Sequence, residues 1–208
     1  MSRWIISGAV VAAAVAVGVG GWIWLQPGGS DDQFAQCREG VIAGGAGAIG
    51  GPFTLVNQSG VTVTDQDVVT EPTLLYFGYT FCPDVCPLDS ARNAEALNIL
   101  TDRGLDAQAA FITVDPARDT PEVVGEFAGM FHPDMMGLTG SAEQVAAAAS
   151  AYRVYSRIHD EEDSEYYLVD HTTFTYLVMP DTGFQAFFRR EDSAEDIANR
   201  TACFIENS

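Results

Sequence analysis

The sequence predicts an α/β domain, a thioredoxin-like three-layer sandwich, preceded by a single N-terminal transmembrane helix. Three observations indicate this fold: a long uncharged apolar run at the N-terminus, strands that alternate with helices, and a cysteine pair directly after an apolar strand. Strands alternating with helices are typical of a sheet that helices cover on its faces. A cysteine pair at a helix start, followed much later by a β-hairpin and a final helix, suggests the thioredoxin architecture.

The N-terminal run reads WIISGAVVAAAVAVGVGGWIWL over residues 4–25 and contains no charge. Its length suits a helix that spans a bilayer. A cleaved signal peptide would have a shorter apolar region that ends at small residues, whereas this run continues through Trp22 and Trp24 to Leu25. Tryptophans at both ends of the run fit anchoring at the membrane interface. We therefore expect an uncleaved membrane anchor.

The flanking charges predict the orientation of this anchor. Arg3 is the only positive charge near the run, and Asp31 and Asp32 follow it. The positive-inside rule then places the N-terminus in the cytoplasm and the domain outside. The expected location is the inner membrane, with the domain in the periplasm, or in the intermembrane space of a mitochondrion. The predicted division is an anchor at 1–26, a glycine-rich linker at 27–51 and a domain at 52–208.

The charge balance is strongly acidic. The chain has 29 acidic and 10 basic residues, all ten of them arginine, and its formal net charge is −19. Such a field repels phosphate backbones and therefore disfavours nucleic acid as a partner, so we expect none. Solubility and association with a basic protein surface both remain open as reasons for the charge.

The first half of the domain predicts a hairpin, a buried strand and a helix, in that order. Residues 53–65 hold two β-rich runs around Asn57–Gly60, a turn sequence. Residues 72–80, PTLLYFGYT, form an apolar run of strand length that leads into the cysteine motif. A helix is expected from 86 to about 102. Its predicted inner stripe consists of Leu88, Ala91, Ala94, Leu97 and Ile99 or Leu100.

The second half predicts alternating strands and helices with clear start signals. The runs AQAAFITVD and MMGLTG read as strands, and the final pair 174–179 and 184–188 reads as a hairpin around a Pro-Asp-Thr-Gly turn. Helices are expected from Thr120 to about Phe131, from Ser141 to about Tyr152, and from near Ser193. The acidic stretch 159–165 is expected to be a solvated loop.

The motif FCPDVCP at residues 81–87 raises three possible roles for its cysteines. Cys82 is expected at a helix start, with Pro83 at the first helical position, where the helix dipole lowers a thiol pKa. Cys82 and Cys86 are four residues apart, so in a helical turn both sulfurs lie on one face. Their Cα atoms would be about 6 Å apart, which permits a disulfide or a shared ion. From the pair alone, a structural disulfide, a redox pair and a metal site all remain open.

A metal site would need a third ligand, and the chain has three histidines. His132 follows a predicted helix and is expected to satisfy carbonyls there, while His159 lies in the acidic loop. His171 precedes a strand that, in a thioredoxin-like domain, follows a loop facing the cysteine helix, so it is the best candidate. Two thiolates and one imidazole suit Cu(I) and fit structural zinc poorly, because zinc takes four ligands. Asp170 is a candidate to orient the imidazole.

Five sequence blocks resemble the Sco/SenC family of copper chaperones, in family order, from about Gly51 to the C-terminus. They are YFGYTFCPDVCP, FITVDPARDTPEVV, FHPDMMGLTG, AYRVY and YLVDHTTFTYLV. The resemblance implies that Cys82, Cys86 and His171 bind copper, as Cu(I) or Cu(II). It also implies assistance in assembling the CuA centre of cytochrome c oxidase, with subunit II as the partner and another copper chaperone as an expected donor.

Some members of that family look more like thiol:disulfide oxidoreductases that keep the CuA cysteines reduced, and this is the alternative function. A redox or copper sensor that acts through a partner is a third hypothesis. Whether the chain is an enzyme therefore stays open at this point.

The remaining candidates have structural explanations. Cys37 and Cys203 lie outside the motif, and four cysteines in an oxidising compartment favour even pairing, so we predict a Cys37–Cys203 disulfide. Asp115 and Asp119 are expected to form and cap a turn, and contact of Asp119 with the site loop is the alternative. Met135 and Met136 are expected in a buried strand, as core residues and not copper ligands.

Overall fold

The computed structural model describes residues 33–38, 46–159 and 167–208. The chain divides into two compact units, residues 1–35 and residues 36–208. The predicted transmembrane helix at 4–25 lies outside the described residues, and none of the helices within them has the length and apolar character that crossing a bilayer requires. The anchor and the domain boundaries at 26 and 51 therefore stay predictions.

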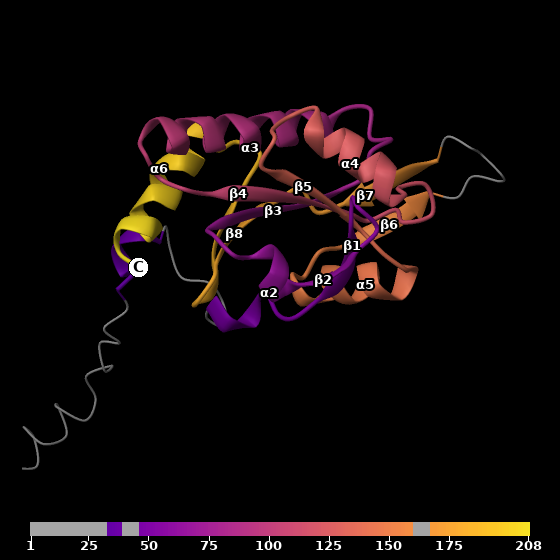
Figure 1. Ribbon diagram of the computed structural model, residues 1–208, viewed down its shortest axis with the longest axis horizontal. Coiled ribbons are helices and arrows are strands. Elements are labelled where there is room, and N and C mark those ends of the chain that lie inside the picture. Colours follow the sequence, from indigo (N-terminus) through magenta and orange to yellow (C-terminus); the bar gives the residue numbers. More distant parts are fainter. Residues whose placement is uncertain (1–32, 39–45, 160–166) are drawn as a thin grey trace, which may run out of the picture. The chain divides into compact units, whose positions relative to one another are not determined.

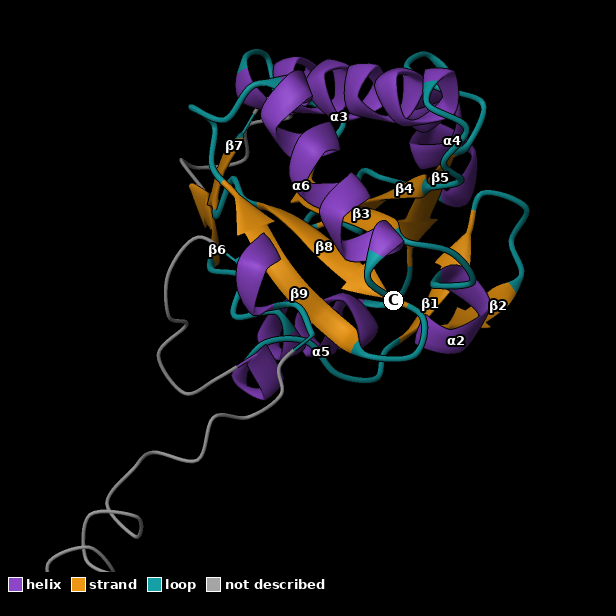
Figure 2. Ribbon diagram, turned by 90° about the vertical axis from the view of Figure 1, so that its left-hand side faces the viewer, coloured by secondary structure: helices purple, strands orange, loops and turns teal. Residues whose placement is uncertain are grey.

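Within the described part of the chain, seven strands form one sheet, in the order β2-β1-β5-β4-β3-β8-β9 (Figure 2). The pairs β3–β4 and β4–β5 are parallel, while β1–β2, β1–β5, β3–β8 and β8–β9 pair antiparallel. Every strand of the sheet falls where the sequence predicts one. Their bounds are β1 Thr54–Asn57, β2 Thr62–Thr64, β3 Thr73–Gly78, β4 Gln108–Thr113, β5 Met135–Thr139, β8 Thr175–Met179 and β9 Gly183–Phe188.

Helices cover both faces of this sheet, which gives the three layers that the sequence predicts (Figure 1). Helices α3 Val85–Asp102, α4 Pro121–Gly129 and α6 Ala194–Glu206 lie on one face, and α5 Ala142–Ala151 lies on the other (Figures 1 and 2). Three of them start at the predicted caps: the side chains of Thr120, Ser141 and Ser193 each accept a backbone N–H of the first turn. Short helices α2 Asp65–Val68, η1 Ala35–Cys37 and η2 Ala46–Ala48 complete the helices of the described residues.

Strand β3 is the centre of the core and all six of its residues are buried. Its alternate side chains point to opposite faces of the sheet. On the α5 side the Phe77 ring packs against Tyr152 and Tyr176, with centroids 5.5 and 6.0 Å away. On the α3 side the Tyr76 hydroxyl donates a hydrogen bond to Asp89 of α3, at 3.0 Å. Because β3 is held on both faces, the cysteine loop that follows it starts from a fixed point.

The buried face of α3 matches the predicted apolar stripe only in part: Ala94, Leu97 and Leu100 are buried, as predicted. Leu88 is 59% exposed and Ala91 is exposed, while Asp89, Ser90 and Asn93 are buried in their place. Tyr76 donates to Asp89, and the Thr175 hydroxyl donates to Asn93 at 3.0 Å. Polar side chains can occupy a buried helix face when another element supplies their hydrogen-bond partners. The spacing of apolar residues along a helix does not show which hydrogen-bond partners other elements will supply, so this pattern could not predict the buried polar residues.

The structure also contains a second sheet, which was not predicted from the sequence. Strands β6 Ser156–His159 and β7 Leu168–His171 pair antiparallel as a two-stranded ribbon, with Ser156 opposite His171. His171 is therefore the last residue of a strand, whereas the sequence placed it just before one. This β6–β7 ribbon forms no part of the seven-stranded sheet as far as the described residues show.

Cys37 and Cys203 form the predicted disulfide, with their Cα atoms 5.7 Å apart. The bond joins η1 to the end of α6. Next to it, the Gln36 amide donates a hydrogen bond to the side chain of Asn207, at 2.8 Å. Residues within the predicted linker are thus attached to the last helix.

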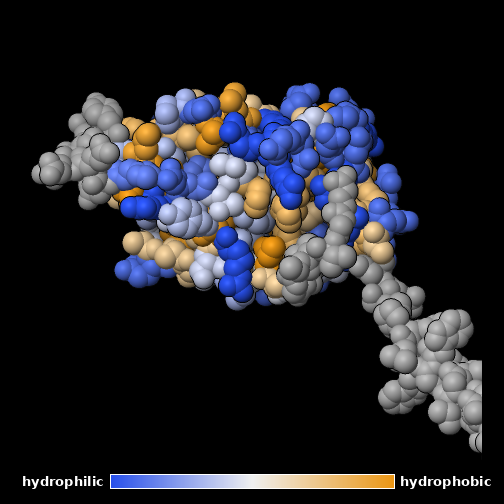
Figure 3. All heavy atoms as spheres, turned by 180° about the vertical axis from the view of Figure 1, so that it is seen from behind, coloured by the Kyte–Doolittle hydropathy of each residue, from blue (hydrophilic) through white to orange (hydrophobic). Residues whose placement is uncertain are grey.

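The surface mixes hydrophilic and hydrophobic side chains, as the view from behind shows (Figure 3). Large apolar side chains that are exposed in the described residues include Val61, Phe81, Leu88, Met130, Tyr155, Ile158 and Leu168. Single exposed apolar residues are ordinary on protein surfaces. Phe81 is the one that directly precedes a cysteine of the motif.

Candidate metal centre

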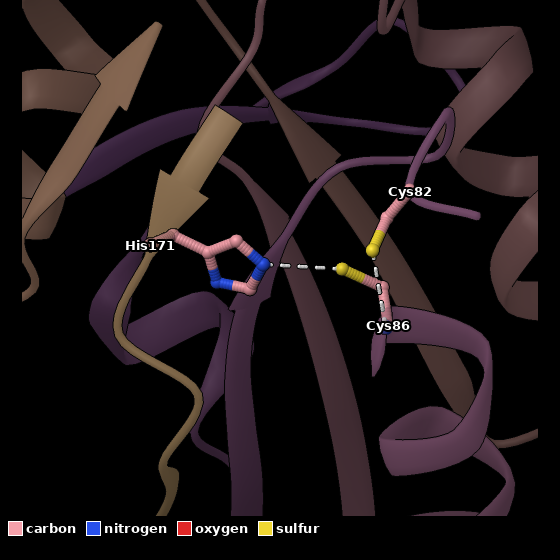
Figure 4. A group of neighbouring side chains, drawn as sticks. All are labelled: Cys82, Cys86 and His171. Atoms are coloured by element: carbon pink, nitrogen blue, oxygen red, sulfur yellow. Dashed lines mark hydrogen bonds between the residues drawn. The ribbon is translucent and has the colours of Figure 1, made fainter. Parts of the chain in front are cut away.

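Three separate segments bring the predicted donors together (Figure 4). Cys82 lies in the loop after β3, Cys86 lies in the first turn of α3, and His171 ends β7. Their ligand atoms all lie within 4.8 Å of one another, and Cys86 Sγ is 3.3 Å from His171 Nε2. The long-range convergence on which the sequence-based hypothesis depends is present.

Gly78, the last residue of β3, makes room for the Cys86 sulfur. A Cβ at this position would lie 3.0 Å from Cys86 Sγ and 2.9 Å from the Tyr76 ring. Both distances are shorter than ordinary van der Waals contacts, so only glycine fits without moving the sulfur. Cys86 itself is fully buried, and Cys82 is 8% exposed. Access to the pair is therefore on the Cys82 side.

Helix α3 begins at Val85, so the prediction that Pro83 occupies its first position is wrong. Cys82 instead precedes the helix, and its sulfur accepts the Cys86 backbone N–H at 3.4 Å. The first-turn N–H groups of a helix lack partners within the helix, and here the sulfur takes one of them. Cys82 is thus held against the positive end of the helix dipole.

The two cysteines differ in protonation. A hydrogen bond from the Cys86 thiol, together with bonds from backbone N–H groups, lowers the pKa of Cys82 well below its ordinary range, against the opposing effect of burial. The same hydrogen bond to Cys82, with burial, raises the pKa of Cys86. At neutral pH the pair is therefore one thiolate and one thiol, and a metal that binds both sulfurs must release the Cys86 proton.

The imidazole of His171 is oriented by its own backbone and by two aromatic rings. Nδ1 lies 3.0 Å from the Thr172 carbonyl oxygen, to which it donates, so the Nε2 lone pair faces Cys86. The rings of Tyr76 and Tyr79 pack edge-on against the imidazole, with centroids 6.2 and 5.8 Å away. This tautomer and orientation are those that a metal-binding histidine requires.

The prediction that Asp170 orients His171 is wrong. Asp170 is exposed, and its carboxylate lies 2.5 Å from His159 Nε2 across the β6–β7 ribbon. Successive residues of a strand point to opposite faces, so Asp170 and His171 cannot both face the cysteines. His132 also differs from expectation, since its Nδ1 accepts the Asp134 backbone N–H at 3.1 Å and no carbonyl bond is involved. Met135 is buried in β5, as expected.

Asp119 contacts the cysteine loop, which is the alternative that the sequence left open beside a turn-forming role. Its buried carboxylate accepts the backbone N–H and the hydroxyl of Thr80 at 3.1 and 2.5 Å, and the Thr113 hydroxyl at 2.6 Å. Thr80 lies two residues before Cys82, so Asp119 fixes the cysteine loop to β4. Burial raises the Asp119 pKa, although the three hydrogen bonds oppose this. The helix cap is the next residue, Thr120.

Replacing Asp119 by Asn is expected to lower the free energy of unfolding by about 1–3 kcal/mol. The amide supplies one acceptor oxygen where the carboxylate supplies two, so a buried donor loses its partner. Urea unfolding followed by circular dichroism measures the change. Asp106→Asn is the matched control, because Asp106 is exposed and a surface change of this kind stays within about 0.5 kcal/mol. Equal stability of the two variants would contradict the role given to Asp119.

The donor set fits a low-coordinate soft ion. Two thiolate sulfurs and one imidazole nitrogen suit Cu(I), whereas structural zinc takes four ligands. Among the described residues, the cluster consists of Cys82, Cys86 and His171, and no further histidine, cysteine or acidic side chain joins these three. Donor atoms within 4.8 Å of one another can reach a common ion at about 2.0–2.3 Å with small side-chain movements.

Comparison with known proteins gives one family. Residues 43–206 match the family model described as SCO1/SenC. Protein SenC of Rhodobacter capsulatus is 49% identical over 198 residues, which cover 95% of this chain and 88% of that protein.

Two solved structures are similar to the described fold. Arabidopsis thaliana ScoI with copper bound is 40% identical, with a TM-score of 0.71, and the match covers 76% of this chain and 99% of that one. BsSco is described as a member of the Sco family of cytochrome c oxidase assembly proteins in which a disulfide switch was identified. It is 25% identical, with a TM-score of 0.58, and the match covers 74% of this chain and 91% of BsSco.

Proposed function

Because the chain belongs to the SCO1/SenC family, we propose that it is a copper metallochaperone that assists assembly of the CuA centre of cytochrome c oxidase. Copper is its cargo, held by the sulfurs of Cys82 and Cys86 and by Nε2 of His171. The observation that carries the proposal is the convergence of these three donors within 4.8 Å, from segments far apart in the sequence. The copper-bound Arabidopsis relative supports the choice of metal.

The states of the three donors suit capture and release of copper. Cys82 is the more exposed sulfur and the one with the lowered pKa, so it is the first thiolate that an incoming ion meets. Cys86 then gives up its proton, and Nε2 of His171, which faces Cys86, completes the set of donors. Because each donor can be replaced in turn by a ligand of the receiving protein, the ion can leave by ligand exchange.

The proposed setting is a membrane-anchored protein whose domain faces the periplasm or the mitochondrial intermembrane space. The uncharged run at 4–25 supports the anchor. The proposed partners are subunit II of cytochrome c oxidase, through its CuA domain, and a second copper chaperone as donor. A formal net charge of −19 suits association with a basic surface on either partner and disfavours nucleic acid.

Adding Cu(II) to the reduced full-length protein is expected to give a sulfur-to-copper charge-transfer absorption band, with about one copper ion per chain. The band arises because a thiolate ligand donates electron density to Cu(II). The measurement is a rapid absorption titration, and the Cys82→Ser protein, which keeps one motif sulfur and the histidine, is expected to lose most of the band. A wild-type spectrum without this band would contradict thiolate ligation.

A second candidate function is reduction of disulfide bonds between CuA-site cysteines, and the unequal thiols favour it. The Cys82 thiolate would attack the partner's disulfide, forming a mixed disulfide and releasing one partner thiolate. The Cys86 sulfur would then attack Cys82, closing the Cys82–Cys86 disulfide and releasing the second partner thiol. The partner gains two electrons, and this protein's dithiol is oxidised. Both cysteines are free thiols in the structure, as the reaction requires.

A further inference from the structure

Four side chains outside the donor set join the two segments that carry the donors. Phe81 directly precedes Cys82, and Tyr167 lies four residues before His171. Asp115 and Arg118 come from the loop between β4 and α4. We call these residues, Phe81, Asp115, Arg118 and Tyr167, the Arg118 cluster.

The guanidinium of Arg118 stacks on rings from both donor segments. Its Cζ lies 3.6 Å from the centroid of the Tyr167 ring and 4.9 Å from that of Phe81. It also lies 5.7 Å from the ring of Tyr79, which itself packs against His171. A planar cation is attracted to aromatic faces, most strongly where water is excluded, and the Arg118 side chain is only 13% exposed.

Asp115 holds this stack in place. Its fully buried carboxylate accepts Arg118 Nε at 2.5 Å through one oxygen and the Tyr167 hydroxyl at 2.7 Å through the other. The Asp115 carbonyl in turn accepts the backbone N–H groups of Arg118 and Asp119, at 3.3 and 3.1 Å. The cluster is therefore built on a hydrogen-bonded turn that does not belong to either donor segment.

The β6–β7 ribbon needs such an attachment. Its two strands pair only with each other among the described residues, and all four residues of β6 are exposed. A two-stranded ribbon is marginally stable by itself in water. Val169 of β7 is buried and His171 packs against Tyr76 and Tyr79, so the ribbon has core contacts at its donor end. Tyr167, just before the strand, provides a further contact at the other end.

We propose that Arg118 is a positioning residue that fastens the β6–β7 ribbon to the cysteine loop and thereby keeps His171 within reach of the two sulfurs. Its consequence for copper retention rests on the proposed function. Its consequence for the ribbon does not, because the contacts of Arg118 involve none of the three donor side chains. Loss of the stack is expected to let the ribbon separate more often and the ion leave faster.

Arg118→Lys tests this role. Lysine keeps the positive charge and can pair with Asp115, but its ammonium group is not planar and cannot stack between two aromatic rings. Amide hydrogen exchange of the metal-free protein is expected to speed up at least about tenfold at 168–171, with β3 and β4 unchanged. Cu(I) dissociation into a competing chelator is expected to be about ten- to a hundredfold faster, the range for residues that support a metal ligand. Arg157→Lys is the matched control, since Arg157 is exposed on the same ribbon.

Tyr167 supplies an independent pair of variants in case the Arg118 variant does not fold. Tyr167→Phe keeps the ring under the guanidinium but loses the hydrogen bond to Asp115, so its ribbon exchange is expected to rise less than that of Tyr167→Leu, which is expected to match Arg118→Lys. Unchanged ribbon exchange in Arg118→Lys and Tyr167→Leu would overturn the inference. So would exchange that rises equally through β3 and β4, because Arg118 would then act on overall stability. Wild-type protein that retains no copper would overturn the proposed function and leave the exchange result as the test of Arg118.

Discussion

Replacing His171 by Ala is expected to weaken Cu(I) retention by roughly a hundredfold or more, beyond the range of about 10–100-fold for residues that only support a ligand. The change removes one of three donors, and the described cluster has no fourth side chain to take its place. The two remaining sulfurs still bind the ion, so affinity falls without disappearing. Competition with a chelator of known affinity measures the loss, and cells that carry the variant should assemble less CuA centre.

The same variant separates the two candidate functions. His171 is not one of the atoms that exchange in thiol–disulfide chemistry, so a reductase should keep most of its rate with a model disulfide. His159→Ala is the matched control, because His159 lies in the same ribbon, is exposed and pairs with Asp170 on the other face. Normal copper affinity and normal CuA assembly in the His171→Ala protein would overturn the metallochaperone proposal and leave the reductase as the better reading.

The double variant Cys37→Ser/Cys203→Ser is expected to lose about 5 kcal/mol of unfolding free energy, because the bond closes a very long loop in the unfolded chain. For a chain of this size the loss corresponds to a melting temperature lower by about 10–20 °C. Thermal unfolding followed by circular dichroism measures it. Substitution is preferable to a reducing agent, because a reductant would also act on the free cysteines Cys82 and Cys86.

Copper binding should survive in this double variant below its melting temperature. The end of α6, which carries Cys203, and the β6–β7 ribbon lie at opposite ends of the sheet (Figures 1 and 2). Effects at sites that share no partners are usually independent. A change in melting temperature of less than a few degrees would show that the disulfide contributes little to stability, and a loss of the Cu(II) band would show that it also shapes the site.

The local signals in the sequence were sufficient for most of the elements. The caps at Thr120, Ser141 and Ser193 each start a helix, and the apolar run at 73–78 is the buried central strand. These features depend on neighbours within a few residues, so a linear reading can find them. The β6–β7 ribbon was missed because its strands are short, exposed and lack the alternating pattern of a half-buried strand.

By itself, the sequence determined which donors are available: two cysteines four residues apart, a histidine before a β-rich segment, and two further cysteines to pair. Only the tertiary structure decided what supports them, namely the Thr172 carbonyl in place of Asp170, the buried Asp119 carboxylate on Thr80, and Arg118 between the rings of Phe81 and Tyr167. The physical reason is the range of the contacts. A donor type is a property of one residue, whereas each support joins groups brought together only when β3, β4 and the β6–β7 ribbon take their places.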